Sequence, residues 1–339
     1  MTAPTPTSAF PIVSFAPFLS GTPEGKQKVA QELYDAFHMY GWVYLKDFGI
    51  EQETVDEMFR RSKSYFDLPL SEKLKHRLRS ASENQGYTAD GDESNGGVDH
   101  KECYEHRRFR NELCPAPGEL DGFREFMDGF YQQCHTLSHH LLQALSLSLS
   151  LPPTYIPTHL KNADPQLRLL HYPPLPPSQL QTPNHSRINP HTDFGLCTIL
   201  FQDEVGGLEV DPFHTDEFVQ AVPIRGTVVI NMADLGMRLS NGRFRSTRHR
   251  VVSPSPASLA TEEHVEREGR NGEMLLPARY STAFFNHPNS DTIITPILVN
   301  EGETSRYEPV NAGEWRAWNT SKNYSSRGLS EIASIAASV

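Results

Sequence analysis

Two histidine-x-aspartate triplets have the residue types and spacing to bind a metal ion. His191 and Asp193 form the first, and His214 and Asp216 form the second. Residues two apart on a β-strand project from the same face, so an imidazole and a carboxylate at this spacing can bind a single ion. With 15 histidines in 339 residues, composition alone predicts roughly 0.7 such triplets by chance. The pattern therefore needs support from its surroundings.

The surroundings of the two triplets differ. His214 and Asp216 lie between two candidate strands, where polar turn residues are expected, and we interpret them as solvated. His191 and Asp193 lead directly into the apolar run 196–201, at the start of a predicted strand. Sheet scaffolds commonly carry functional side chains at such positions. The first triplet is therefore the candidate metal site.

A third ligand is available at His249. It alternates with Arg248 and Arg250, so its imidazole can face the interior while both arginines face outward. The 55 residues between Asp193 and His249 leave room for the strands that would bring the two side by side in a jelly roll. Taken alone, His249 is better interpreted as a core histidine bonded to a backbone carbonyl. Together with His191 and Asp193 it completes a ligand set.

Two imidazoles and one carboxylate are the facial triad of non-haem iron, which leaves three coordination positions open for a co-substrate and oxygen. Zinc with three protein ligands and a water is the competing metal, and ligand identity alone does not exclude it.

A second pair of residues has the chemistry to bind a carboxylate. Arg279 and Ser281 share one face of a predicted strand, and a guanidinium beside a hydroxyl can donate several hydrogen bonds to one anion. An inward arginine without an anionic partner would be costly. The alternative is an exposed arginine on an edge strand.

The first part of the chain predicts helices and the rest predicts strands. Apolar spacing indicates helices over 24–40, 53–66 and about 120–149, and residues 80–118 read as loop. After Pro152, β-branched and aliphatic segments alternate with turn signals. The predicted strands are 167–172, 197–202, 208–211, 218–222, 227–232, 244–252, 279–285 and 293–299.

Strands at this spacing predict a mainly β fold with flanking helices, built on a double-stranded β-helix (jelly roll). We expect residues 1–152 to form a helical amino-terminal region that packs on a core over 153–339. Asn241-Gly242 predicts a hairpin turn between two strands. Residues 253–273 read as a polar insertion between strands.

Composition narrows the classes of partner. The net charge of −11 repels phosphate backbones and anionic lipid, so we expect neither nucleic acid nor membrane as a partner. The four cysteines show no CxxC spacing, which fits a reducing compartment. The amino-terminal residues lack the pattern of a signal peptide, and we expect a cytoplasmic protein.

The combined motifs resemble a known enzyme family. His191-Thr192-Asp193, His249-Arg250-Val251 and Arg279-x-Ser281 are similar to those of the Fe(II) and 2-oxoglutarate dioxygenases of the isopenicillin N synthase-like group. Within this group, the sequence is most similar to those of fungal thymine hydroxylase and fungal secondary-metabolite oxygenases. Further matching segments are residues 10–13, 41–45, 62–69, 169–173, 202–203, 206–208 and 240–242.

The resemblance implies a cofactor, co-substrates and roles for the residues. His191, Asp193 and His249 would bind Fe(II) and be catalytic, and the ion would be chelated by 2-oxoglutarate. Arg279, Ser281 and Tyr172 would hold the distal carboxylate of that co-substrate. With O2, the enzyme would release succinate and carbon dioxide while oxidising a small organic molecule in secondary metabolism, by hydroxylation, desaturation, ring formation or ring expansion. The spacing between His249 and Arg279 exceeds that usual in the family, and the insertion accounts for the excess.

The substrate pocket is expected to be lined from variable loops. Arg187, four residues before His191, favours an anionic or carbonyl-rich substrate such as a phenolic aldehyde or a pyrimidine, and the alternative is a surface arginine. The candidate substrate contacts are Arg187, Asn189, Tyr104, Phe213 and the segment near Trp315 and Trp318.

Three alternatives remain open. They are a thymine-type pyrimidine hydroxylase, an isopenicillin N synthase-like oxidase that uses no co-substrate, and a small-molecule-binding jelly roll without catalysis. Arg279 and Ser281 do not separate the oxidase without a co-substrate from the main hypothesis, whereas intact His191, Asp193 and His249 argue against the binding protein.

Overall fold

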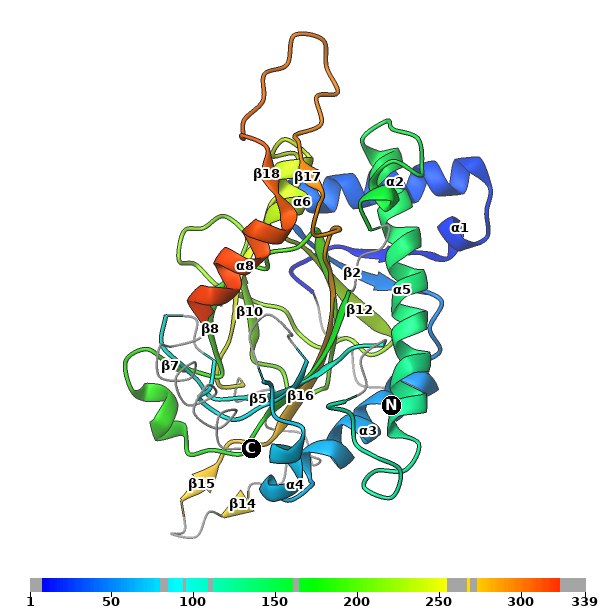
Figure 1. Cartoon of the computed structure of the whole chain (residues 1–339). Coiled ribbons are helices and arrows are strands. Elements are labelled where there is room, and N and C mark those ends of the chain that lie inside the picture. Colours follow the sequence, from blue (N-terminus) through cyan, green and yellow to red (C-terminus); the bar gives the residue numbers. More distant parts are fainter. Residues whose placement is uncertain are drawn as a thin grey trace, which may run out of the picture.

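Two β-sheets at the centre of the molecule form the predicted jelly roll (Figure 1). The computed structural model describes residues 8–79, 85–93, 96–108, 112–160, 165–254, 267–268 and 273–323. The major sheet has the order β1 (Ile12–Ser14), β2 (Trp42–Lys46), β12 (Thr227–Met232), β9 (Cys197–Gln202), β16 (Arg279–Asn286), β6 (Gln166–Tyr172), β5 (Glu102–His106) and β3 (Gly86–Thr88). The minor sheet has the order β11 (Val219–Gln220), β10 (Leu208–Asp211), β13 (Arg248–Val251) and β8 (Ile188–His191).

The three long helices form where apolar spacing predicts them. They are α2 (Pro23–Met39), α3 (Gln52–Phe66) and α5 (Phe123–Ser148). Helix α2 begins where the Thr22 hydroxyl accepts a hydrogen bond from the amide of Gly25 at 3.1 Å. It ends before Gly41, whose φ is +65° and where a Cβ would lie 2.3 Å from the carbonyl oxygen of Arg245. Only glycine fits that turn without strain.

Shorter elements complete the covering layer. They are α1 (Ala16–Leu19), α4 (Leu70–Lys75), α6 (Asp234–Leu239), α8 (Ala312–Asn323) and two 3-10 turns, Ile156–Leu160 and Pro177–Gln181. Helix α5 packs on α2 and borders the major sheet, whereas α8 contacts β18 (Val310–Asn311) and is drawn in front of the jelly roll (Figure 1). No helix among the described residues combines the length and apolar character that crossing a bilayer requires.

The loop predicted over residues 80–118 is wrong for part of that segment. It contains β3, β5 and β4 (Val98–Asp99), and β5 pairs with β6 along its whole length. All five residues of β5 are buried, including Glu102 and Glu105. These carboxylates are paired with Lys73, at 2.7 Å, and with Arg168. The strand is polar in sequence because its buried charges have partners elsewhere in the chain.

Two further predictions need correction. Asn241 and Gly242 do form a turn with φ of 53° and 78°, but it follows the unpredicted helix α6 instead of joining two strands. The strands predicted over 218–222, 244–252 and 293–299 are shorter, and they reduce to β11, β13 and β17 (Ile293–Ile294), which pairs with β18 (Val310–Asn311).

Strands from both halves of the chain share the major sheet. β2 lies between β1 and β12, and β5 lies beside β6. Most of the predicted insertion over 253–273 lies outside the described residues. Its strand β14 (Arg267–Glu268) pairs with β15 (Met274–Leu275), which directly follows the insertion, and β16 keeps its place between β9 and β6. The insertion therefore leaves the strand that carries Arg279 in register. A further short strand, β7 (His185–Ser186), pairs with β4.

Candidate active site

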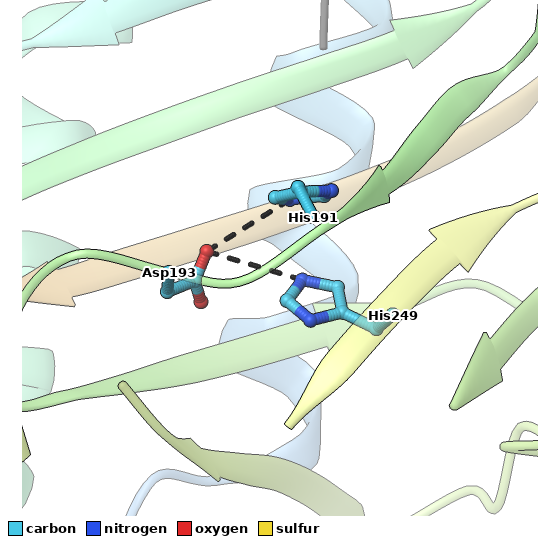
Figure 2. Close-up of side chains that lie close together, drawn as sticks. All are labelled: His191, Asp193 and His249. Carbon is cyan, nitrogen blue, oxygen red and sulfur yellow. Dashed lines mark ion pairs between the residues drawn. The ribbon is translucent and has the colours of Figure 1, made fainter. Parts of the chain in front are cut away.

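Three side chains that are distant in sequence converge inside the jelly roll (Figure 2). His191 ends β8, Asp193 lies in the loop that follows, and His249 lies on β13 directly opposite His191. Each Nε2 atom lies 3.9 Å from Oδ1 of Asp193. The ligand atoms of the three residues all lie within 4.8 Å of one another. Such convergence is what a shared metal ion requires.

Backbone carbonyls orient both imidazoles. Nδ1 of His191 lies 2.9 Å from the carbonyl oxygen of Asn189, and Nδ1 of His249 lies 3.1 Å from that of Thr247. A carbonyl oxygen can only accept, so each Nδ1 carries the proton and donates it. Each Nε2 therefore keeps its lone pair on the side that faces Asp193. This is the tautomer that a metal ligand needs.

Asp193 is oriented by two hydrogen bonds to its other oxygen. Oδ2 accepts from the hydroxyl of Thr198 at 2.6 Å and from the side-chain amide of Asn231 at 2.8 Å. Burial acts to raise the pKa of Asp193, but the adjacent imidazoles of His249 and His191 and these hydrogen bonds outweigh it, so its pKa is lowered. Asp193 is therefore a carboxylate whose Oδ1 remains directed toward the two imidazoles.

The protonation of His191 also suits a metal site. Burial, and then the neighbouring His249, lower the pKa of His191 to about 4. Its ring is therefore neutral at physiological pH and can donate its lone pair. Two imidazoles with oriented lone pairs and one anionic oxygen fit the two-histidine, one-carboxylate set of non-haem Fe(II).

Replacing Thr198 with valine is expected to weaken Fe(II) binding by about 10- to 100-fold, the usual effect of removing a hydrogen bond that orients a ligand. The substitution keeps the shape of the side chain but removes the hydrogen bond to Asp193. Anaerobic Fe(II) titration measures the affinity. Thr282→Val is the matched control, because the Thr282 hydroxyl contacts Met58. Equal Fe(II) affinity in the Thr198 variant and the wild type would contradict the prediction.

A cavity beside the three side chains is lined from both sheets and from α8. Arg279 and Ser281 line one wall, and a guanidinium nitrogen of Arg279 donates to the Ser281 hydroxyl at 3.3 Å. Tyr172 pairs with Arg279 across β6 and β16, and its hydroxyl lies 3.4 Å from that of Ser281. Arg279 is 1% exposed. A buried guanidinium with two hydroxyls beside it matches a carboxylate.

The four residues predicted to contact the substrate lie outside the lining of this cavity. Tyr104 is buried and donates to the carbonyl of Leu113, Phe213 is half exposed in a turn, and the Asn189 amide donates to Asp99 at 2.8 Å. Arg187 is fully buried. The described residues that line the cavity include none of these four. From the carboxy-terminal segment, Arg316 and Thr320 of α8 line the cavity beside the predicted tryptophans.

Several cavity residues were missed by the sequence analysis. Glu93 pairs with Lys101 at 2.5 Å and with Arg168 at 3.1 Å, and all three side chains line the cavity. Counting back from Tyr172 in steps of two along β6 reaches Leu170, Arg168 and Gln166, which all line it. This alternation could have found Arg168. No comparable signal marks Glu93 and Lys101, which lie in the segment predicted as loop.

The second triplet is a turn, as predicted. His214 and Asp216 have φ of 57° and 66° and are exposed. Asp216 pairs with Arg248, and a ring nitrogen of His214 lies 2.8 Å from the carbonyl oxygen of Ser246. These partners account for both side chains without a metal ion.

Acidification is expected to destabilise the protein through His287, which lines the cavity. Burial, and then the charges of Arg316 and Arg107, lower the pKa of His287 to about 3. The unfolded chain therefore binds the proton more readily, so the penalty is absent well above pH 6.5 and grows as the pH falls toward 3. At pH 4 it reaches on the order of 3 kcal/mol. Urea unfolding at pH 7 and pH 4 measures it, with His287→Phe as the comparison. Equal acid destabilisation of both proteins would contradict this origin.

Comparison with known proteins gives consistent results. Residues 10–127 match the model for the amino-terminal region of the non-haem dioxygenase in morphine synthesis, and residues 163–288 match the 2OG-Fe(II) oxygenase superfamily. The chain is 33% identical to the 2-oxoglutarate-dependent dioxygenase frbA of Dothideomycetidae sp. (strain 11243), over 93% of this chain and 96% of that protein. It is 32% identical to the 2-oxoglutarate-dependent dioxygenase htyE of Aspergillus rugulosus, over 88% of this chain and 94% of that protein.

The three-dimensional structure of the chain is also similar to solved structures. The crystal structure of full-length Neurospora crassa T7H in complex with alpha-KG has a TM-score of 0.81 and 31% sequence identity, and the match covers 92% of this chain and 96% of that one. A second structure of T7H, in complex with alpha-KG and thymine, has a TM-score of 0.81 with the same coverage and 30% identity.

Proposed function

Because the chain belongs to the 2OG-Fe(II) oxygenase superfamily, we propose that His191, Asp193 and His249 hold its Fe(II). The protein is a 2-oxoglutarate-dependent dioxygenase, with Fe(II) as cofactor and 2-oxoglutarate and O2 as co-substrates. The observation that carries the ligand assignment is the convergence of two Nε2 lone pairs and one carboxylate oxygen within 4.8 Å. Thr198 and Asn231 keep that oxygen directed toward the imidazoles.

We further propose that Arg279 holds the distal carboxylate of 2-oxoglutarate. Its guanidinium is buried at the cavity wall, and the hydroxyls of Ser281 and Tyr172 lie beside it. A charge that is already desolvated and oriented binds a carboxylate without further ordering. When bound, Fe(II) and 2-oxoglutarate supply oxidative decarboxylation coupled to oxidation of a substrate C–H bond.

The substrate that we propose is a small organic molecule bound between the triad and α8. Arg168, Lys101 and Gln166 make this wall of the cavity polar, and Phe285 adds an aromatic surface. Polar groups at fixed positions in such a wall select a substrate by its hydrogen-bonding pattern. In keeping with its named fungal relatives, we place the reaction in secondary metabolism.

A pyrimidine hydroxylase is the second candidate. The likeness to T7H in complex with thymine, at a TM-score of 0.81, favours it. Succinate release that rises when thymine is added would support this candidate. Succinate release that is unchanged by thymine would reject it.

The function is tested by anaerobic addition of 2-oxoglutarate to the Fe(II)-loaded protein. We expect the visible charge-transfer band of the chelate, and we expect the His191→Ala variant to lack it because one of three ligands is missing. O2 uptake with and without 2-oxoglutarate completes the test. Iron-loaded wild-type protein without the band, or uptake that is independent of 2-oxoglutarate, would overturn the assignment.

A further inference from the structure

A second buried guanidinium lies behind the proposed co-substrate site. Arg187 immediately precedes β8 and is 0% exposed. One of its nitrogens, Nη2, donates to the carbonyl of Pro277 at 2.5 Å. Its Nε and Nη1 atoms have no hydrogen-bond partner in the part of the chain that the structure describes. A buried cation with unsatisfied donors is costly, so a residue of this kind indicates a partner that the protein alone does not supply.

Arg187 and Arg279 lie against the same aromatic ring. Their guanidinium carbons are 6.0 Å and 4.7 Å from the centre of the Tyr172 ring. Burial, and then the charge of Arg279, lower the pKa of Arg187 to about 10, which leaves it charged at physiological pH. The two cations therefore belong to one electrostatic site, although Arg187 itself does not line the cavity.

The acidic residue at this site does not balance the two cations. Asp203 interacts electrostatically with both arginines, but its oxygens accept hydrogen bonds from the amides of Tyr280 at 2.5 Å and Val205 at 3.1 Å. Burial raises the pKa of Asp203 to about 6. The hydrogen bonds that the structure describes for the two guanidiniums go to neutral acceptors, namely the Pro277 carbonyl, the Ser281 hydroxyl and the Gln202 side-chain oxygen. The site therefore has two positive charges for one negative charge.

We propose that Arg187 is a positioning residue for 2-oxoglutarate: it acts through the Tyr172 ring and supplies the second positive charge that the distal carboxylate neutralises. This inference rests on the proposed function of Arg279. A cation over the face of a phenol fixes the ring and strengthens its hydroxyl as a donor. The Tyr172 hydroxyl is 3.4 Å from that of Ser281, so Arg187 would align both hydroxyls with the carboxylate. The uncompensated charge would then be satisfied only when the co-substrate is bound.

The first test compares two ligands of the Fe(II)-loaded protein under anaerobic conditions. In Arg187→Met we expect the Kd for 2-oxoglutarate, measured from the chelate band, to rise by about 10-fold, because one of the two positive charges that the distal carboxylate neutralises is lost. The Kd for 2-oxobutyrate, which chelates in the same way but lacks the distal carboxylate, should be unchanged. Arg187→Lys keeps the charge and should show an intermediate Kd for 2-oxoglutarate.

The second test measures thermal stability, where the sign of the change separates this role from a structural one. Arg187→Met should raise the melting temperature of protein without 2-oxoglutarate, because it removes an uncompensated buried charge. It should also reduce the further stabilisation by saturating 2-oxoglutarate. Arg243→Met is the control, since Arg243 is paired with Glu303 at 2.5 Å outside the cavity. That control should lower the melting temperature and leave the Kd for 2-oxoglutarate unchanged.

The outcomes separate the inference from the proposed function. If wild-type protein fails to bind 2-oxoglutarate, the proposed function is wrong, and the inference that rests on it is wrong too. If the wild type binds it and Arg187→Met binds it equally well, only the inference fails. Equal weakening of 2-oxoglutarate and 2-oxobutyrate, or a lowered melting temperature without 2-oxoglutarate, would assign Arg187 a structural role and overturn the inference.

Discussion

Replacing Asp193 with alanine is expected to abolish turnover of 2-oxoglutarate, with a rate loss of at least about 1,000-fold. Asp193 supplies the only carboxylate among the three converging side chains. Its removal leaves two neutral imidazoles to hold a dication, and it also removes the acceptor of the hydrogen bonds from Thr198 and Asn231. Loss of the carboxylate weakens metal binding, and the donors left unsatisfied in the interior lower the stability of the protein. Initial rates of succinate release, with Fe(II) affinity measured in parallel, give the size of the loss.

The sequence itself provides the matched control for this experiment. Asp216 ends the other histidine-x-aspartate triplet, and its side chain is 83% exposed where it pairs with Arg248. An ion pair at such an exposed position contributes little to stability, so Asp216→Ala is expected to keep wild-type rates. Wild-type activity in Asp193→Ala would refute the assignment of Asp193 as a metal ligand. An equal loss of activity in Asp193→Ala and Asp216→Ala would refute it as well.

Replacing Arg279 with methionine is expected to raise the Kd for 2-oxoglutarate by about 30-fold to several thousand-fold. This range corresponds to the roughly 2–5 kcal/mol cost of truncating one partner of a buried, hydrogen-bonded charge pair. The proposed partner charge is the distal carboxylate, which would enter a wall that Arg279 no longer neutralises. Anaerobic titration of the chelate band measures this Kd directly.

Two related variants test the geometry of the same contact. Arg279→Lys keeps the charge but loses the planar fork that donates to both carboxylate oxygens, so it should recover only part of the affinity. Ser281→Ala removes one neutral hydrogen bond and should weaken binding by about 10-fold or less. An Arg279→Met variant with unchanged affinity for 2-oxoglutarate would exclude this wall as the carboxylate site.

The sequence determined the features that depend on local periodicity and turn chemistry. Short segments rich in β-branched and aliphatic residues between turn signals were sufficient to predict β9, β12 and β16. Helical spacing likewise predicted α2, α3 and α5. Context around His191 separated the candidate metal site from the solvated turn at His214. In each case the information lies within a few residues of the element concerned.

The tertiary structure decided the features that depend on partners far along the chain. β5 is buried because Glu102 and Glu105 find Lys73 and Arg168, and a local pattern cannot distinguish a paired buried carboxylate from a solvated one. The cavity wall likewise combines β6 with α8, which local sequence does not bring together. Arg187 is a further residue whose burial and pairing could not be predicted from the local sequence. The sequence predicted a substrate contact or a surface residue, whereas packing buries it beside Tyr172, with two nitrogens that have no partner among the described residues. Whether a charge is paired, exposed or left for a ligand is a property of three-dimensional surroundings, because desolvation depends on every atom that displaces water from it.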